Sequence, residues 1–320
     1  SFLKINQFKR RIIMLKYSKV VGLAVFVFLF AMCNQKSKNE AENETILKGS
    51  LDITVDETIK PIVEDMVAVF EGTYYEAKIA IKPKSEAELI NDLLNQKAKV
   101  VVTTRELTTE EKARFEKSKI NPRVTPFATD AIAFVTNKGN NDTLIALKTV
   151  IDFLQGKSDS GIKGLVFDNP NSSTVRYMKD LAKVKELPSK NVFSFKTNDE
   201  VIKFVSENDG MIGVVGVNWL YQPSPNMLDI IKKINVMSVK GLNGDGYYNP
   251  TQNDLGEKKY PLARDLFIIN CQGYTGLGMG FASFISGDIG QRIVLKSGLL
   301  PVRMPGRNLK IRSQIIKDKE

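Results

Sequence analysis

The 320-residue sequence contains no histidine, one tryptophan and only two cysteines. Without histidine, the chain lacks the commonest general base, the commonest zinc ligand and every Ser-His or Cys-His nucleophile pair. Carboxylate pairs and lysine bases remain as enzyme routes, but the sequence shows no recognisable motif of either kind. These absences favour a binding protein over an enzyme, and they indicate neither a metal nor a cofactor.

The two cysteines, Cys33 and Cys271, stand in different contexts. Lys16 and Lys19 precede an apolar run at 20–30, and Cys33 follows shortly after that run. The run is shorter than the ~20 residues that span a bilayer, and it is typical of a signal peptide. The cysteine at its end resembles a bacterial lipoprotein processing site, at which the thiol is lipidated. A plain secretory signal and a marginal anchor helix are the alternatives.

Cys271 has no disulfide partner if Cys33 carries lipid. It lies in the apolar run 266–271, which predicts a buried and unreactive thiol.

Charge is unevenly distributed along the chain. Six of the 46 basic residues lie within residues 1–32, where there is no acidic residue. The remaining 40 nearly balance the 36 acidic residues and are dispersed, so the sequence does not indicate nucleic-acid binding.

Strand-like and helix-like segments alternate from about residue 50 onward, which is typical of an α/β protein with a parallel sheet covered on both faces. We expect strands at 51–55, 78–81, 100–102, 131–136, 165–167, 192–195, 211–215 and 266–269. We expect helices at 59–70, 86–96, 108–118, 147–154, 174–184, 199–206, 280–285 and 289–295, and a final extended segment around 299–311.

The alternation restarts near residue 130, and the C-terminal part is long enough to complete the first sheet. We therefore predict two α/β lobes with a hinge and an interlobe cleft. The predicted parts are a signal peptide with the lipoprotein cysteine at 1–33, a flexible tether at 34–47, a discontinuous first lobe at 48–128 and 236–312, a second lobe at 129–235, and a charged tail at 313–320.

Three predicted strand-to-helix junctions are rich in hydroxyl and acidic side chains. They are Asp56-Glu57-Thr58, Thr103-Thr104-Arg105 and the segment 169–174. Ligands of open α/β sheets lie at the carboxyl ends of strands, where a helix N-terminus offers unpaired N–H groups and partial positive charge to an anion. The same residue types are ordinary helix caps, so both interpretations stay open at this point.

Several blocks resemble the PstS-type phosphate-binding lipoproteins, which are the solute receptors of phosphate ABC transporters. Their order and spacing follow the family between about residues 50 and 311. The blocks are Thr103-Thr104-Arg105-Glu106-Leu107-Thr108, the segment 130–137, Leu154-Gln155-Gly156-Lys157, Asn171-Ser172-Ser173-Thr174-Val175-Arg176, the segment 260–267, Phe281-Ala282-Ser283-Phe284, Gly290-Gln291-Arg292 and Gly298-Leu299-Leu300-Pro301.

The resemblance implies the two-lobed fold of class II periplasmic binding proteins and capture of an oxyanion, inorganic phosphate, without enzymatic activity. It also implies a monomer that is lipid-anchored to a bacterial membrane, in the periplasm or on the outer cell surface, and that serves the permease of an ABC importer. Two alternatives stay open: a receptor for another anion such as sulfate or molybdate, and a surface lipoprotein that reuses the fold for sensing or adhesion.

Carried over by position, the residues that line the anion site are Thr58, Thr104, Arg105, Ser172, Ser173 and Thr174. Asp56 or Glu57 would accept the proton that phosphate carries near pH 7 and would repel sulfate. Helix capping is the alternative role for these two carboxylates.

Two residues depart from the family pattern. Ser173 replaces the glycine of the family's Ser-Gly-Thr loop, where glycine gives the backbone more freedom. Asp168 stands in a stretch where relatives often place an arginine. A carboxylate there lowers the field at an anion, and Asp168 could also hold Arg176 or cap a turn.

Overall fold

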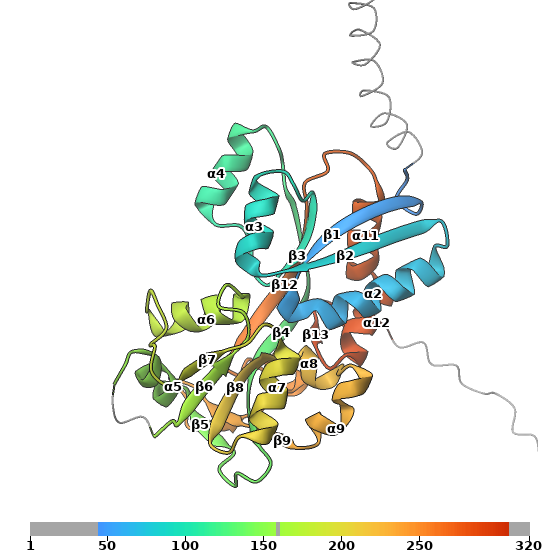
Figure 1. Ribbon diagram of the computed structural model, residues 1–320. Coiled ribbons are helices and arrows are strands. Elements are labelled where there is room, and N and C mark those ends of the chain that lie inside the picture. Colours follow the sequence, from blue (N-terminus) through green and yellow to red (C-terminus); the bar gives the residue numbers. More distant parts are fainter. Residues whose placement is uncertain (1–43, 158–160, 307–320) are drawn as a thin grey trace, which may run out of the picture.

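The structure, a computed structural model, describes residues 44–157 and 161–306. Figure 1 shows these residues as an upper and a lower lobe, each with strands and covering helices. The predicted signal peptide, most of the predicted tether, the lipidation residue Cys33 and the predicted C-terminal tail lie outside the described residues.

The first lobe, at the top of Figure 1, is built around one twisted sheet. Its strands are β1 (Gly49–Asp56), β2 (Ala77–Lys84), β3 (Val100–Thr103) and β12 (Ala263–Asn270). Its helical elements are η1 (Glu57–Ile59), α2 (Lys60–Thr73), α3 (Glu86–Leu94), α4 (Thr109–Lys117), α11 (Leu277–Ser286) and α12 (Asp288–Lys296).

Both faces of this sheet are covered by helices. Apolar residues at helical spacing in α2, from Ile62 to Phe70, are buried against one face together with α11. Leu89 and Leu93 of α3 and Phe115 of α4 form a second apolar cluster on β3 and β12. The periodicity of these helices was visible in the sequence because burial requires it.

The second lobe carries its own strands and helices. The strands are β5 (Leu144–Ala146), β6 (Gly164–Phe167), β7 (Val192–Ser194), β8 (Met211–Gly216), β9 (Ile234–Val236), β10 (Ser238–Lys240) and β11 (Tyr247–Tyr248). The helical elements are α5 (Leu147–Leu154), α6 (Ser173–Ala182), α7 (Asn198–Glu207), α8 (Asn218–Tyr221), η2 (Pro225–Met227) and α9 (Leu228–Ile231). The short elements α10 (Gln252–Gly256) and β13 (Leu300–Pro301) complete the described chain.

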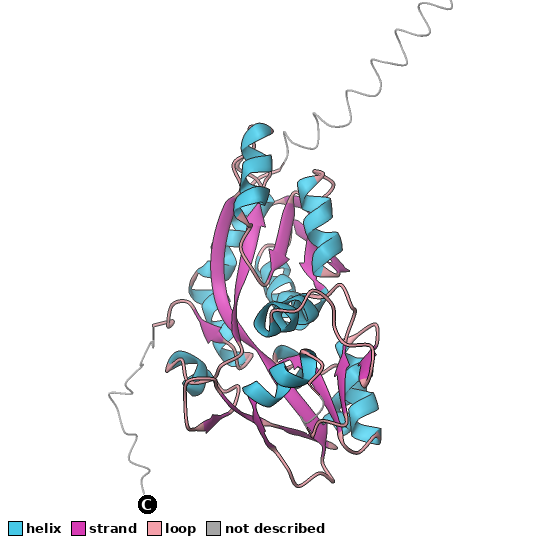
Figure 2. Cartoon of the chain, turned by 90° about the vertical axis from the view of Figure 1, so that its left-hand side faces the viewer, coloured by secondary structure: helices cyan, strands magenta, loops and turns pink. Residues whose placement is uncertain are grey.

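One long strand, β4 (Arg123–Asn137), joins the two lobes. Its first half pairs with β12, and its second half pairs with β8. The main sheet therefore continues through both lobes in the order β2-β1-β3-β12-β4-β8-β6-β7. Figure 2 shows long strands running from the upper lobe toward the lower one.

The predicted parallel pairing is present in each lobe, where β1 is parallel to β2 and β3, and β6 is parallel to β7 and β8. The sheet as a whole is mixed, because β4 is antiparallel to β12 and to β8, and β12 is antiparallel to β3. The prediction of a strand at 131–136 covered only the second half of β4. The first half carries no continuous apolar run, and Pro126 stands at a shift in register opposite β12. Proline within a strand is tolerated at such irregularities, but in the sequence it argues against a strand, so this part of β4 was not predicted.

The C-terminal part of the chain returns to the first lobe later than the predicted boundary at residue 236. β10 pairs with β5, and β11 pairs with β10, so the segment 238–248 lies with the second lobe. These strands have two or three residues each, too few to show an alternation of apolar and polar side chains.

Candidate anion-binding site

Two chain segments from different lobes meet at the centre of the molecule. The hydroxyl oxygens of Thr58, in η1, and of Ser173, at the first position of α6, lie 2.9 Å apart. Both residues are fully buried. The sequence predicted that these two junctions line one site, and the structure brings them into direct contact.

Local hydrogen bonds form each junction. Asp56 ends β1, and its Oδ1 accepts a hydrogen bond from the Thr58 N–H at 3.0 Å. Ser172 caps α6, because its Oγ accepts from the Val175 N–H at 3.2 Å. The first amides of a helix have no partner within the helix, and the helix dipole is positive there. The start of α6 therefore presents donors toward η1.

Several polar atoms of this site have no partner within the described residues. Among them are Oδ2 of Asp56 and Oγ1 of Thr174, whose residues are both fully buried. Buried polar atoms are normally hydrogen-bonded, so an unpaired acceptor and an unpaired hydroxyl on the two contacting segments indicate a place for a polar ligand.

Sequence reasoning missed the guanidinium of this site. Arg264 of β12 donates from Nε and Nη2 to Oδ2 of Asp130 in β4, at 3.0 and 2.7 Å. Its Nη1 donates to Ser173 Oγ at 3.2 Å. Both residues are buried cross-strand neighbours in the antiparallel pair. A charged residue inside each apolar strand was the available signal, since buried charges are rare unless paired.

Gly216, at the end of β8, has no side chain and so allows the Arg264 guanidinium and the Thr58 carbonyl to lie close to the strand. A Cβ at this position would lie 2.9 Å from Arg264 Nη2 and 2.9 Å from the Thr58 carbonyl oxygen. That same carbonyl accepts hydrogen bonds from Asn218 Nδ2 at 3.0 Å and from Trp219 Nε1 at 2.9 Å. Sequence reasoning missed this cluster too, because its members are far apart in the chain.

Asp168 lies behind the α6 start and does not hold Arg176. Its Oδ1 accepts from the Ser172 hydroxyl at 2.6 Å, and its Oδ2 accepts from Asn198 Nδ2 at 3.1 Å. Burial, together with a smaller contribution from the charge of Asp56, raises the pKa of Asp168 to about 7 despite the Ser172 hydrogen bond.

Asp56 and Glu57 also have raised pKa values. Burial raises the pKa of Asp56, with Arg264 acting in the opposite direction. Glu57 is half-buried, and its Oε1 has no partner within the described residues. Burial, followed by the charges of Asp168 and Asp56, raises the pKa of Glu57 to about 7.

The structure places Thr104 and Arg105 in a different cluster, around Glu86 of α3. Thr104 Oγ1 donates to Glu86 at 3.3 Å, and Arg105 Nε donates to it at 3.2 Å. The Nη atoms of Arg105 donate to both carboxylate oxygens of Glu111, at 2.8 and 2.9 Å. The guanidinium of Arg105 thus donates to two carboxylates and to a backbone carbonyl, and not toward the cluster around Ser173.

Glu86 also links the two lobes. Arg176 of α6 donates from Nε to Glu86 Oε1 at 2.6 Å, and Glu86 is nearly fully buried. A hollow of about 560 Å³ lies beside this ion pair between α3 and α6, with Arg105, Ser172 and Lys179 in its lining. The predicted interlobe cleft therefore opens to solvent on a side that carries several cations.

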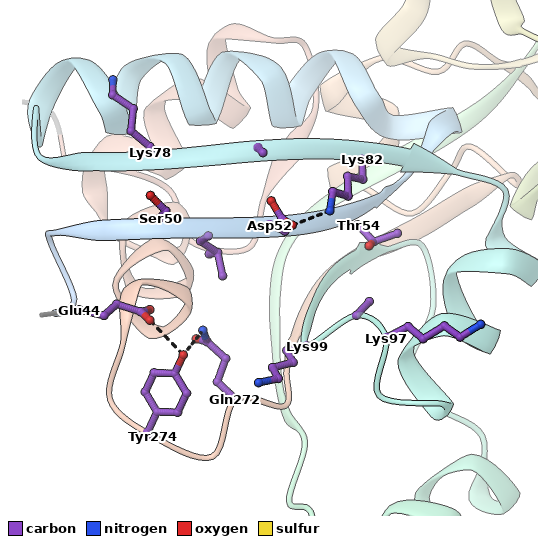
Figure 3. Close-up of a pocket in the computed structure, with 13 residues that line it drawn as sticks. Glu44, Ser50, Asp52, Thr54, Lys78, Lys82, Lys97, Lys99, Gln272 and Tyr274 are labelled. Atoms are coloured by element: carbon purple, nitrogen blue, oxygen red, sulfur yellow. Dashed lines mark hydrogen bonds and ion pairs between the residues drawn. The ribbon is translucent and has the colours of Figure 1, made fainter. Parts of the chain in front are cut away.

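A second hollow, of about 480 Å³, lies on the first-lobe sheet (Figure 3). Most of its polar side chains are exposed, and some of them pair with one another: Lys82 donates to Asp52, and Tyr274 donates to Glu44. It contains none of the site residues that the sequence predicted. Solvent-exposed side chains of this kind bind a ligand less well than the buried polar groups around Ser173.

Across 44–157 and 161–306, no group of three or more Cys, Asp or Glu side chains is arranged to hold a metal ion. Over the same ranges, no helix combines the length and the apolar character needed to cross a membrane.

Comparisons with known proteins bear on the fold and the family of this chain. The phosphate-binding protein PstS of Borreliella burgdorferi is 25% identical over 301 residues, which cover 89% of this chain and 99% of that protein. A structure described as a phosphate ABC transporter substrate-binding protein with bound phosphate, from Clostridium perfringens, superposes with a TM-score of 0.67 at 20% identity. This superposition covers 80% of this chain and 100% of the Clostridium perfringens chain.

An ABC-type phosphate transport receptor from Vibrio cholerae has the same fold, with a TM-score of 0.61 at 14% identity over 79% of this chain and 100% of that one. The two-lobed fold predicted from the sequence is thereby confirmed. A family model described as the PBP superfamily domain matches residues 40–288, which is most of the sequence, and the chain belongs to the PBP superfamily.

Proposed function

We propose that this protein is an extracytoplasmic solute-binding protein that captures inorganic phosphate and presents it to the permease of an ABC importer. The observation that carries the proposal is the buried meeting of Thr58, Ser173 and Arg264 beside two unpaired polar atoms. The names of the relatives support phosphate as the anion.

Capture requires the lobes to separate. Thr58 and Ser173 touch directly, so an anion can enter only if η1 moves away from α6. The anion then replaces the Thr58–Ser173 contact with its own bonds to both hydroxyls, to Arg264 and to the first amides of α6. Charge-assisted bonds of this kind are about twice as strong as neutral ones. β4, which runs through both lobes, must bend, as must the segment between β11 and β12 by which the chain returns to the first lobe.

Selectivity for phosphate follows from Asp56. Hydrogen phosphate keeps one proton near neutral pH, and the unpaired Oδ2 of Asp56 can share it. Sulfate brings no proton, so it would face an ionised carboxylate or require Asp56 to take up a proton from water. A site built around such a shared proton rejects the anion that lacks it.

Binding without catalysis is the proposed activity, since the sequence has no histidine and the relatives are named as binding proteins. Lipidation of Cys33, attachment to a bacterial membrane and a monomeric state belong to the same proposal. A lipid at the N-terminus would keep the receptor close to its permease.

Isothermal titration with phosphate, sulfate and molybdate tests the function, with Thr174→Val as the informative variant. Valine keeps the shape of threonine and removes only a hydroxyl that has no partner in the structure. Loss of one buried bond to the anion costs about 1–3 kcal/mol, which is about 5- to 150-fold in affinity. Thr109→Val, at the exposed start of α4, is the matched control and should bind as wild type.

Wild-type phosphate affinity in Thr174→Val would overturn the site. Tighter binding of sulfate or molybdate than of phosphate would favour the receptor for another anion. No binding of any of the three anions would favour the surface lipoprotein without a small ligand.

A further inference from the structure

Ser172 is predicted to line the anion site, yet its only hydrogen is already used. A hydroxyl has one hydrogen to donate and two lone pairs to accept with. The Ser172 hydroxyl donates to Asp168 Oδ1 at 2.6 Å and accepts from the Val175 N–H at 3.2 Å. With Asp168 ionised, Ser172 can offer an anion no hydrogen bond from its side chain.

The charges around the site are also unfavourable for an anion. Asp56, Asp130 and Asp168 are fully buried, and half-buried Glu57 stands beside them. The one buried guanidinium among the described residues is that of Arg264, and Asp130 already pairs with it. If every carboxyl were ionised, the cluster would be strongly negative before phosphate arrived.

A proton on Asp168 resolves both difficulties. The carboxyl can then donate from Oδ1 to Ser172 Oγ, which has a second lone pair free beside the Val175 bond. Asp168 Oδ2 keeps its bond from Asn198 Nδ2, and the Ser172 hydrogen turns toward the anion. The same oxygen–oxygen contact of 2.6 Å serves both directions of the bond.

We propose that anion capture is coupled to the uptake of one proton from solvent by Asp168, which reverses the Asp168–Ser172 hydrogen bond and makes Ser172 a donor to the anion. No bond between heavy atoms forms or breaks. The proton comes from water or buffer and returns when the anion leaves. This inference rests on the proposed function, because it concerns the same site.

The groups that face Asp168 set the range of pH. Asp56 and Glu57 of the β1–η1 segment raise its proton affinity, while Arg264 of β12 and the bonds from Ser172 and Asn198 lower it. The resulting pKa of about 7 means that Asp168 is about nine-tenths ionised at pH 8 and about one-tenth ionised at pH 6. Proton uptake on binding should therefore be large at pH 8 and small at pH 6.

Asp168→Asn imitates the protonated side chain. Asparagine can donate from Nδ2 to Ser172 Oγ and accept from Asn198 with Oδ1, and it carries no charge. We expect this variant to bind phosphate about tenfold more tightly than wild type at pH 8 and about equally at pH 6. The factor follows from the cost of protonating a group of pKa about 7 at pH 8.

Titration calorimetry of the whole protein with phosphate, in two buffers of different ionisation enthalpy at pH 8, counts the protons taken up. Phosphate itself titrates in this range, but its contribution is common to wild type and variant and cancels in the difference. We expect Asp168→Asn to take up about one proton fewer. Asp245→Asn, an exposed carboxylate on the second lobe, is the control and should match wild type.

A double-variant cycle tests the route through Ser172. Removal of the Asp168 charge favours the anion with or without Ser172, but the reversed hydrogen bond needs the Ser172 hydroxyl, so the affinity gain of Asp168→Asn at pH 8 should shrink in a Ser172→Ala background. Equal proton uptake in wild type and Asp168→Asn, or an undiminished advantage without Ser172, would overturn the inference and leave phosphate binding standing. Failure of both proteins to bind phosphate at any pH would instead overturn the proposed function.

Discussion

Replacing Arg264 with methionine separates the structural role of the buried ion pair from its role in binding. The side chains of Arg264 and Asp130 are 2% and 0% exposed, and three hydrogen bonds hold the guanidinium. Removing one partner leaves the other charge buried and unpaired, which costs about 3–5 kcal/mol in proteins. We expect Arg264→Met to lower the free energy of unfolding by that amount at pH 8.

The pH dependence of this loss has a definite sign. Burial raises the pKa of Asp130 even beside Arg264, and removal of the guanidinium raises it further. A carboxyl with a higher pKa in the folded than in the unfolded protein binds more protons when folded, so stability falls as pH rises between the two pKa values. Arg264→Met should therefore lose less stability at pH 5 than at pH 8.

Urea unfolding, followed by circular dichroism at both pH values, measures the effect. The double variant Arg264→Met with Asp130→Leu removes both charges and should recover most of the lost stability. Neither variant should bind phosphate with wild-type affinity, because the guanidinium is absent from both. Wild-type stability of Arg264→Met, or a double variant no more stable than the single one, would refute the reasoning.

Four further outcomes are expected. Glu86→Gln weakens the ion pair with Arg176 that links the lobes, so small-angle scattering of the anion-free protein should give a larger radius of gyration than wild type; an unchanged radius would show that this ion pair does not hold the lobes together. Gly216→Ala should weaken phosphate binding at least tenfold and destabilise the fold by about 1–3 kcal/mol, whereas Gly72→Ala, whose Cβ would meet nothing within 4 Å, should do neither. Cys271, with a thiol pKa raised by burial to about 11, should react with a thiol reagent at pH 8 far more slowly in the folded than in the unfolded protein. Cys33→Ser should release the protein from membranes, and membrane association that persists in this variant would count against lipidation.

Much of the fold could be predicted because local patterns report burial. The helix expected at 147–154 has those bounds in the structure. It could be predicted because its buried apolar residues recur at helical spacing. Strands β6 and β8 likewise follow short apolar runs. The first half of β4 could not be predicted, because it is only partly buried and contains a proline at an irregularity of the sheet.

The predicted site was partly right for the same reason. Asp56 and Ser172 make hydrogen bonds to amides two or three residues away, so their junctions are local features that a sequence motif can reveal. Arg105 was assigned to the site because it belongs to a family motif. In the structure its N–H groups donate to Glu86 and Glu111 instead, and a motif around Arg105 does not reveal these tertiary partners.

By itself, the sequence determined the caps, the helices and the apolar strands, which depend on residues within a few positions of each other. Only the tertiary structure decided that Ser173 meets Thr58, 115 positions earlier, and that Arg264 reaches both Ser173 and Asp130. It also decided that the pKa of Asp168 is raised, since that shift depends on burial and on charges supplied by two other segments. The physical reason is that solvent exclusion and charge pairing are properties of the assembled interior, whereas a cap or a helical period is complete within one stretch of chain.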